Sequence, residues 1–265
     1  MFLEPRLIAE LLLLGLATGF LAGLLGIGGG MLMVPAVTFV LAAKGFPPEH
    51  IVKMAVATSL ATICFTSISS VRAHHKRGAV LWPVVLRLTP GILLGAALGA
   101  QVAVAMPTRA LSILFSVFIT FAATQMLLNR KPEPTRTLPG TPGMVAVGGG
   151  IGVLSALVGA GGAFVSVPFM QWCNVRIHNA VATSAALGFP VALAGTASYV
   201  WAGRNLQNLP GSLGYLYLPG LVLISLASMT MAPLGARTAH GMDIRPLKRV
   251  FALVLYCLAA YFLFR

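Results

Sequence analysis

The sequence predicts an all-α integral membrane protein, and two observations carry this prediction. First, 58% of the 265 residues are hydrophobic, 9% are charged and the mean hydropathy is +0.91, far above what a soluble core of this size needs. Second, apolar blocks long enough to cross about 30 Å of hydrocarbon as helices fill nearly the whole chain: 7–25, 51–71, 80–104, 108–128, 143–160, 180–202, 213–234 and 246–264. We expect about eight long transmembrane helices.

The charged residues are placed as in a membrane protein. The formal net charge is +13, but the basic residues lie mainly at the ends of the apolar blocks, where they orient membrane helices. We therefore expect no nucleic-acid partner. The first apolar run continues past Gly30 to about Val40 and has a counterpart in the second half, which argues against a cleaved signal peptide.

The cysteines give no indication of a cofactor. Cys64, Cys173 and Cys257 lie far apart, without the spacing of a metal or redox motif. We expect them to be small apolar packing residues, with no metal and no cofactor.

A glycine-rich pattern that ends in proline occurs twice. The segment "GIGGGMLMVP" at 26–35 is similar to "GAGGAFVSVP" at 159–168. The segment "AVATS" at 55–59 then recurs unchanged at 180–184. A pattern repeated in the same order indicates an internal duplication.

The duplication divides the chain into two related halves. Later in the halves, "PG" at 90–91 matches "PG" at 219–220. We predict a first membrane repeat over residues 1–130 and a second over residues 143–265, joined by a polar, proline-rich linker loop at 131–142.

The glycine-rich segments interrupt their apolar blocks. The block from Leu7 to Ala43 is too long for one pass and too short for two, which predicts a long helix, a glycine turn and a half-length return. The short return helices would begin at about Met31 and Phe164. Each hairpin returns the chain to its side of entry and three crossings follow, so the second half would be inverted. The result is 8–10 membrane segments in two inverted repeats, the hairpins being broken or re-entrant.

The distribution of basic residues supports these hairpins. With both termini outside, six basic residues fall on the outer side and eleven on the inner side: Arg72, Lys76, Arg77, Arg130, Lys131, Arg136, Arg176, Arg237, Arg245, Lys248 and Arg249. If each glycine block crossed only once, the two sides would be nearly equal. An excess on the inner side is the usual pattern, so we expect both termini outside.

The glycine turns are the predicted binding site. Irregular backbone is tolerated at membrane depth only when it is packed in protein or lines a wet cavity. Helix N-termini that meet at the midplane offer N–H groups and partial positive charge to an anion. We predict a small-anion site formed by Gly28, Gly29, Gly30, Met31, Gly161, Gly162, Ala163 and Phe164, with Pro35 and Pro168 as helix breaks. Close helix packing by small residues is the alternative interpretation of the glycines.

Polar side chains near mid-membrane are further candidates for the anion site. Hydroxyls can donate to an oxyanion, although they also commonly bond carbonyls of their own helix. Arginine inside an apolar block is a candidate by default, although it can also reach the interface. The candidates are Thr58, Ser59, Thr62, Thr183, Ser184 and Arg87.

The few acidic residues exclude some classes of transporter. The acidic residues are Glu4, Glu10, Glu49, Glu133 and Asp243, and only Glu10 falls inside an apolar block, near its end. Because proton and cation pathways typically use buried carboxylates, the sequence argues against a cation channel or pump.

The duplicated GxGGG…VP and AVATS motifs resemble the TauE/SafE family of membrane proteins, often called sulfite exporters. The resemblance covers essentially the full length, including the near absence of loops. It implies transport of small sulfur-containing or organic anions such as sulfite, thiosulfate or sulfoacetate, commonly outward across the bacterial inner membrane. Ala163 departs from the pattern, because the first repeat has Gly30 at that place.

The resemblance and the residues together predict an exporter that works by alternating access. An inside-negative potential contributes about 2.3 kcal/mol per elementary charge per 100 mV, so an anion can leave without cation coupling. Proton-coupled uptake of the same anions is the nearest alternative, and a non-transporting subunit of a membrane complex is another. The sequence lacks HExxH, a serine-hydrolase arrangement and paired glutamates, so we expect no enzyme.

Overall fold

Ten helices and one short hairpin make up the described part of the chain. The computed structural model describes residues 5–25, 30–128, 135–206, 209–241 and 245–264. The first five helices are α1 (Pro5–Leu25), α2 (Gly30–Ala43), α3 (Pro48–Lys76), α4 (Trp82–Ala105) and α5 (Thr108–Leu128). The remaining elements are α6 (Thr141–Val158), α7 (Ala163–Trp172), α8 (Ile177–Ala202), β1 (Ser212–Leu213), β2 (Leu216–Tyr217), α9 (Leu218–Gly241) and α10 (Arg245–Phe264).

The helix lengths confirm the predicted all-α membrane fold. Eight of the described helices have 18 to 29 residues, whereas α2 has 14 and α7 has 10. Six of the eight, namely α3, α4, α5, α6, α8 and the first 18 residues of α9, are long and apolar enough to cross a membrane. The short helices begin at Gly30 and Ala163, one residue before the predicted positions.

Glycine and proline residues set several helix ends. Pro48 starts α3 and Pro83 lies in the first turn of α4, where a missing N–H costs nothing because helix N-termini have no intrahelical acceptor. Gly78 follows α3 with φ +65°, and Gly159 follows α6 with φ +71°. Glycine adopts this left-handed backbone without strain and so ends a helix sharply.

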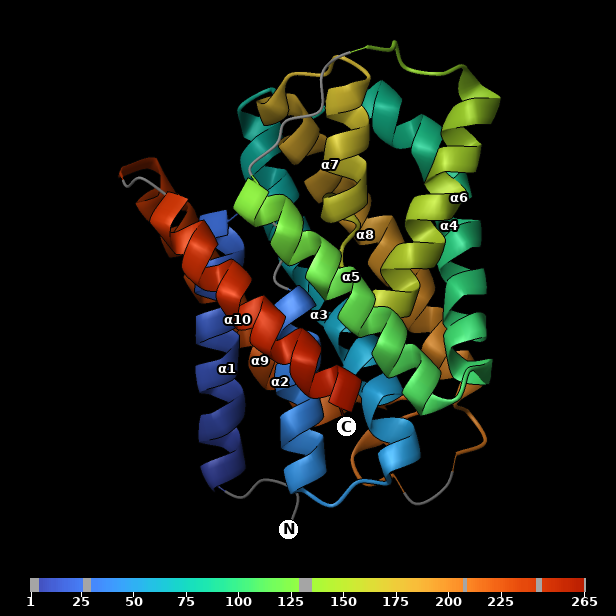
Figure 1. Cartoon of the computed structure of the whole chain (residues 1–265), viewed down its shortest axis with the longest axis vertical. Coiled ribbons are helices and arrows are strands. Elements are labelled where there is room, and N and C mark those ends of the chain that lie inside the picture. The colour runs from blue at the N-terminus through green and yellow to red at the C-terminus, as the bar shows by residue number, and fades with distance from the viewer. Residues whose placement is uncertain (1–4, 26–29, 129–134, 207–208, 242–244, 265) are drawn as a thin grey trace.

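The short helices turn the chain back toward the end from which it came. In Figure 1, α1 rises from the lower end and α2 runs back down to it, whereas α6 descends from the upper end and α7 runs back up. The two hairpins thus enter from opposite ends of the molecule. α1 begins and α10 ends in the lower part of the same view.

Helices α3 and α8 form the centre of the bundle. In the most apolar stretch of α3, 78% of the residues are buried, compared with 33% for α5. α8 is next, with 56% of its stretch buried. These two helices carry the AVATS segments, so the duplicated hydroxyl residues lie in the protein interior rather than toward lipid.

Small residues bring two pairs of helices into close contact. A Cβ atom on Gly152 of α6 would lie 2.5 Å from the carbonyl oxygen of Ile92 on α4, and one on Gly19 of α1 would lie 2.5 Å from the Cα of Ser228 on α9. Larger side chains would therefore force the backbones apart. The two pairs are α4 with α6 and α1 with α9. Each pair joins a helix from the first half of the chain to one from the second, as Figure 1 shows for α4 and α6.

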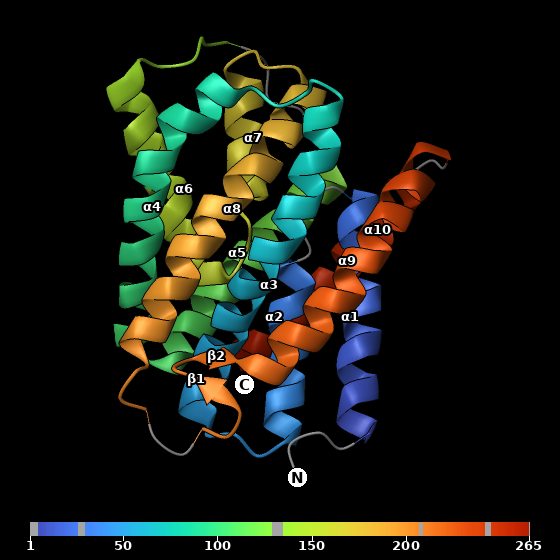
Figure 2. The same ribbon diagram turned by 180° about the vertical axis from the view of Figure 1, so that it is seen from behind.

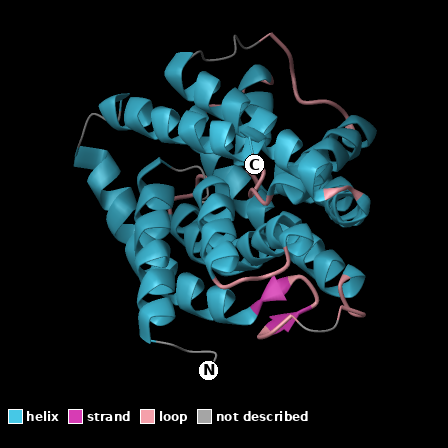
Figure 3. Cartoon of the chain, turned by 60° about the horizontal axis from the view of Figure 1, so that its bottom comes forward, coloured by secondary structure: helices cyan, strands magenta, loops and turns pink. Residues whose placement is uncertain are grey.

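The β-hairpin corrects the predicted start of one helix. We expected an apolar helical block from residue 213, but α9 begins only at Leu218. Ser212 pairs with Tyr217 and Leu213 with Leu216, around a turn in which Gly214 has φ +59°. Two glycines within four residues favour this turn over a helix. Figures 2 and 3 show the hairpin at the lower rim of the bundle.

Candidate functional site

The first described residue after the first glycine break lies directly against the second break. A Cβ atom on Gly30 would lie 2.5 Å from the carbonyl oxygen of Gly159 and 3.2 Å from the Cα of Ala160. Only a glycine allows this approach of two backbones. The predicted residues Gly28 and Gly29 lie outside the described residues.

The second break is enclosed by helices of both halves. A Cβ atom on Gly159 would touch Val34 of α2 and Val56 of α3, at 2.7 and 3.2 Å. One on Gly161 would lie 3.5 Å from Ile63 of α3. The irregular backbone of the second break is thus packed in protein, which is the condition for irregular backbone inside a membrane.

Two left-handed glycines shape the second break. Gly159 ends α6, and its N–H donates to the carbonyl of Ser155 at 2.9 Å. Gly162, with φ +77°, precedes α7, and its carbonyl accepts from the N–H groups of Val165 and Ser166. Ala163 and Phe164 come too early in α7 for their N–H groups to have an acceptor within the helix. They are the donors that an anion at this helix end would use.

Met31 and Phe164, the predicted first residues of the short helices, place their side chains in the hydrophobic core. Both side chains are buried and apolar, and the Phe164 ring packs edge-on against Phe118 of α5 with centroids 6.5 Å apart. Pro35 and Pro168 lie inside α2 and α7, which continue through them. Each proline deprives the carbonyl four residues earlier of its helical donor.

Ser59 ties the first AVATS segment to the second break. Its Oγ donates to the carbonyl of Gly159 at 2.8 Å, and the side chain is fully buried. The neighbouring Thr62 instead donates to the carbonyl of Thr58, one turn earlier in its own helix. Thr62 thus bonds a carbonyl of its own helix in this structure, which was the alternative to binding an anion.

Thr58 and Thr183 make matching bonds in the two halves. Thr58 Oγ1 accepts from the backbone N–H of Tyr217 at 3.1 Å, and Thr183 Oγ1 accepts from that of Leu81 at 3.0 Å. Each acceptor is fully buried, and each donor immediately precedes a long helix of the opposite half, α9 or α4. We call these two contacts the threonine latches.

The threonine latches correct the predicted register between the halves. They match Leu81 with Tyr217, which also matches Pro83 with Pro219 as the second residues of α4 and α9. Close contacts follow the same register: Gly148 packs against the carbonyl of Leu88, and Gly15 against that of Ile224. The sequence match of the two "PG" pairs at 90–91 and 219–220 was therefore wrong, because it is shifted by seven residues.

Ser184 bonds to a neighbour within its own half. Its Oγ lies 2.7 Å from the Oγ of Ser166, which joins α8 to α7. Arg87, in contrast, has an exposed side chain on α4, next to the fully buried Leu88. In the corrected register its counterpart in the second half is Leu223. The structure does not bring Arg87 to the glycine breaks.

Sequence reasoning missed two features near the second break. Ser155 Oγ is buried and has no hydrogen-bond partner among the described residues, although it lies beside Gly162. Tyr199 is fully buried, and its hydroxyl donates to the carbonyl of Ala156 at 3.0 Å. Comparing the halves could not reveal Ser155, because the residue aligned with it in the first half is Ala22.

Two tyrosines of the β-hairpin segment, Tyr215 and Tyr217, are also buried. The rings of Tyr199 and Tyr215 meet edge to face with centroids 6.3 Å apart, and Tyr215 packs similarly against His50. Burial raises the pKa of Tyr215 and of Tyr217 above the ordinary value of a phenol. Both hydroxyls therefore remain neutral at physiological pH.

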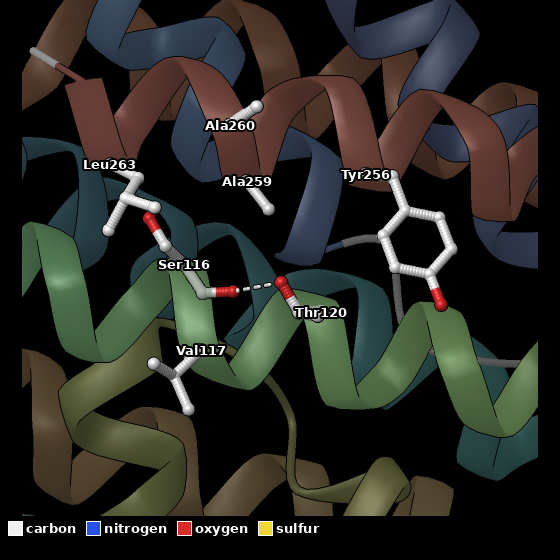
Figure 4. Close-up of a pocket in the computed structure, with 7 residues that line it drawn as sticks. All are labelled: Ser116, Val117, Thr120, Tyr256, Ala259, Ala260 and Leu263. Carbon is white, nitrogen blue, oxygen red and sulfur yellow. Dashed lines mark hydrogen bonds between the residues drawn. The ribbon is translucent and has the colours of Figure 1, made fainter.

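A separate groove lies between α5 and α10 (Figure 4). Its volume is about 340 Å³. Its hydroxyls are already bonded, because Thr120 donates to the carbonyl of Ser116 and Tyr256 bonds Thr124. The lining is otherwise apolar: Val117, Ala259, Ala260 and Leu263. Such a surface suits contact with hydrocarbon and has no charged side chain to attract an anion.

The fold and the breaks define the class of protein as a polytopic membrane protein with interrupted helices packed at its centre. Within the described residues, no three His, Cys, Asp or Glu side chains gather in a way that could hold a metal ion.

Comparisons with known proteins place the chain more closely. The family profile described as "Sulfite exporter TauE/SafE" matches residues 11–262. A probable membrane transporter protein of Haemophilus influenzae is 34% identical over 250 residues, covering 94% of this chain and 95% of its own. Another from Methanocaldococcus jannaschii is 26% identical and covers 97% of this chain and 96% of its own. No solved structure matches the chain. The chain belongs to the TauE/SafE family of membrane transporters.

Proposed function

We propose that this protein is a secondary transporter of small anions, most simply an exporter of sulfite or a related sulfur-containing or organosulfonate anion. The observation that carries the proposal is the contact of Gly30 with Gly159 and Ala160, next to the N-terminus of α7. Interrupted helices from two hairpins that enter from opposite ends are the usual construction of a transporter site. The description of the matching family profile supports sulfite as the first candidate substrate.

The proposed site binds its anion without a fixed positive charge. The N–H groups at the start of α7 and the partial charge of the helix end attract a negative ligand. No Lys or Arg side chain is needed, so the anion is held weakly enough to leave again. The site consists of the residues around the two breaks, together with the hydroxyls of Ser59, Ser166 and Ser184 that lie beside them.

Transport would proceed by alternating access between the two halves. We propose that residues 1–130 and 143–265 are inverted repeats, joined by the loop at 131–142. The threonine latches hold the two halves together at opposite ends, Tyr217 at one and Leu81 at the other. Opening one end while the other stays bonded would expose the breaks to one side at a time. We place the protein in the bacterial inner membrane with both termini outside.

Anion flux into and out of liposomes tests this function. The purified protein is reconstituted, and sulfite, thiosulfate, sulfoacetate and lactate are tested with the membrane potential clamped at either sign. We expect flux of one or two of the sulfur anions, faster when the potential pulls the anion across. Flux that follows an imposed pH gradient and ignores the potential would instead favour proton-coupled uptake. Absence of flux for all four anions would contradict the proposal.

A further inference from the structure

We propose that the hydroxyl of Ser155 is a direct ligand of the transported anion, donating a hydrogen bond to an anion oxygen held at the N-terminus of α7. This inference rests on the proposed anion transport. It assigns to the site a side chain that neither the repeat pattern nor the AVATS segments contain.

The hydroxyl of Ser155 is buried and unused. The residue is only 2% exposed, and its Oγ has no hydrogen-bond partner among the described residues. Several other buried helical hydroxyls donate to the carbonyl one turn earlier, as Thr18 does to Leu14 and Thr38 to Val34, whereas Ser225 of α9 is, like Ser155, without a partner among the described residues. Ser155 does not do so, although its own helix offers the carbonyl of Ile151. A buried hydroxyl that ignores this acceptor requires an explanation.

The position of Ser155 supplies that explanation. Its Oγ lies 3.1 Å from the place that a Cβ atom on Gly162 would occupy, and Gly162 is the residue immediately before α7. The Ser155 carbonyl accepts from the N–H groups of Gly159 and Ala160, so the same residue fixes the turn. The free hydroxyl therefore lies between the end of α6 and the start of α7.

The chemistry of this corner suits an oxyanion. A hydroxyl can rotate its hydrogen toward a ligand oxygen, and the first N–H groups of α7 donate from the helix end. Sulfite and thiosulfate each carry several acceptor oxygens and can accept from both sources at once. Hydrogen bonds to a charged acceptor are stronger than bonds between neutral groups. The ligand would thus satisfy the hydroxyl that the protein leaves unbonded.

The inference also makes the two half-sites unequal. The residue aligned with Ser155 in the first half is Ala22, whose side chain cannot donate a hydrogen bond. Ser155 with the start of α7 would therefore give the second break more of the anion's hydrogen bonds. Gly162 must stay glycine for two reasons, because its φ is +77° and a side chain there would press on the Ser155 hydroxyl.

The test compares Ser155→Ala with Ser116→Ala in liposomes that contain sulfite or thiosulfate. Ser116 is an apt control because it is also a buried helical serine, but its Oγ already donates to the carbonyl of Ser112. We expect Ser155→Ala to raise the KM for sulfite by about ten- to a hundredfold, with a smaller change in kcat. Ser116→Ala should leave KM unchanged.

A second readout separates ligand binding from a structural role. Sulfite should raise the melting temperature of the wild-type protein and of Ser116→Ala, but not that of Ser155→Ala. Without ligand, Ser155→Ala should melt at least as high as the wild type, because it removes an unbonded buried hydroxyl. A lower melting temperature with an unchanged KM would overturn the inference and leave the proposed transport intact. No sulfite or thiosulfate flux in the wild type would overturn the proposed function, and this inference with it.

Discussion

Thr58 and Thr183 occupy matching places in the two halves and make matching bonds, whereas the bonds seen for the serines that follow them, within the described residues, differ. Ser59 reaches across to the carbonyl of Gly159 in the other half, whereas Ser184 bonds to Ser166 of its own half. The comparison shows which contacts the two similar segments share and which they do not. The bonds at the starts of α4 and α9 are repeated, whereas the bond between Ser166 and Ser184 is not, because Met33 is aligned with Ser166.

Enlarging a glycine at a tight interhelical contact should cause the largest loss of stability. A Cβ atom on Gly152 would lie 2.5 Å from the carbonyl oxygen of Ile92, whereas one on Gly150 of the same helix meets nothing within 4 Å. We expect Gly152→Leu to destabilise the fold by about 3 kcal/mol or more, and Gly150→Leu by far less. Unfolding in mixed micelles measures both. Equal losses for the two variants would mean that α6 does not pack against α4 as described.

The threonine latches give the next largest effect. Thr58→Val leaves the buried backbone N–H of Tyr217 without its acceptor, and Thr183→Val does the same to the partly buried N–H of Leu81. We expect each to cost about 1–3 kcal/mol in the free energy of unfolding, with Thr→Ser restoring most of it at both sites. Similar losses at the two sites would support equivalent roles. A neutral Thr183→Val beside a costly Thr58→Val would show that the symmetry is only apparent.

Substituting Ser59 or Ser184 should cause smaller losses of stability and tests how the two serines differ. Removing either hydroxyl breaks one buried hydrogen bond, and we expect a loss of about 1 kcal/mol for Ser59→Ala and for Ser184→Ala. The double variant Ser166→Ala with Ser184→Ala should be closer to the wild type than Ser184→Ala alone, because it leaves no unpaired hydroxyl. A double-mutant cycle of thermal unfolding checks this coupling.

Arg87 should show the smallest effect. Its side chain is exposed and its counterpart in the corrected register is Leu223, so we place it outside the anion site. We expect Arg87→Gln to change anion flux less than about twofold and stability by less than about 0.5 kcal/mol. A large loss of flux in this variant would return Arg87 to the binding site, as the sequence first suggested.

Much of the fold followed from hydropathy and glycine spacing. The apolar block at 108–128 has the same bounds as α5, and the starts of α2 and α7 were expected to within one residue. The sequence did not predict the hairpin at Ser212–Tyr217, because its residues are nearly as apolar as those of a membrane helix and only the glycines mark the turn.

The site was harder to predict than the fold. The proximity of Gly30 to Gly159 could be inferred from inversion, but the use of each hydroxyl could not. Thr58 accepts a backbone N–H and Thr62 bonds its own helix, although both belong to one short polar stretch. Ser155 was invisible because a lone serine in an apolar helix carries no signal, and its importance depends on having no partner among the described residues.

The most direct test of the account is the sulfite flux of Gly30→Ala beside that of Gly150→Ala, both in liposomes with a clamped potential. The added methyl on Gly30 would lie 2.5 Å from the carbonyl oxygen of Gly159, whereas that on Gly150 points into open space. If the two breaks form the anion site, Gly30→Ala loses at least about tenfold in flux while Gly150→Ala keeps the wild-type rate. Equal, wild-type flux in both variants would contradict a site at the glycine breaks.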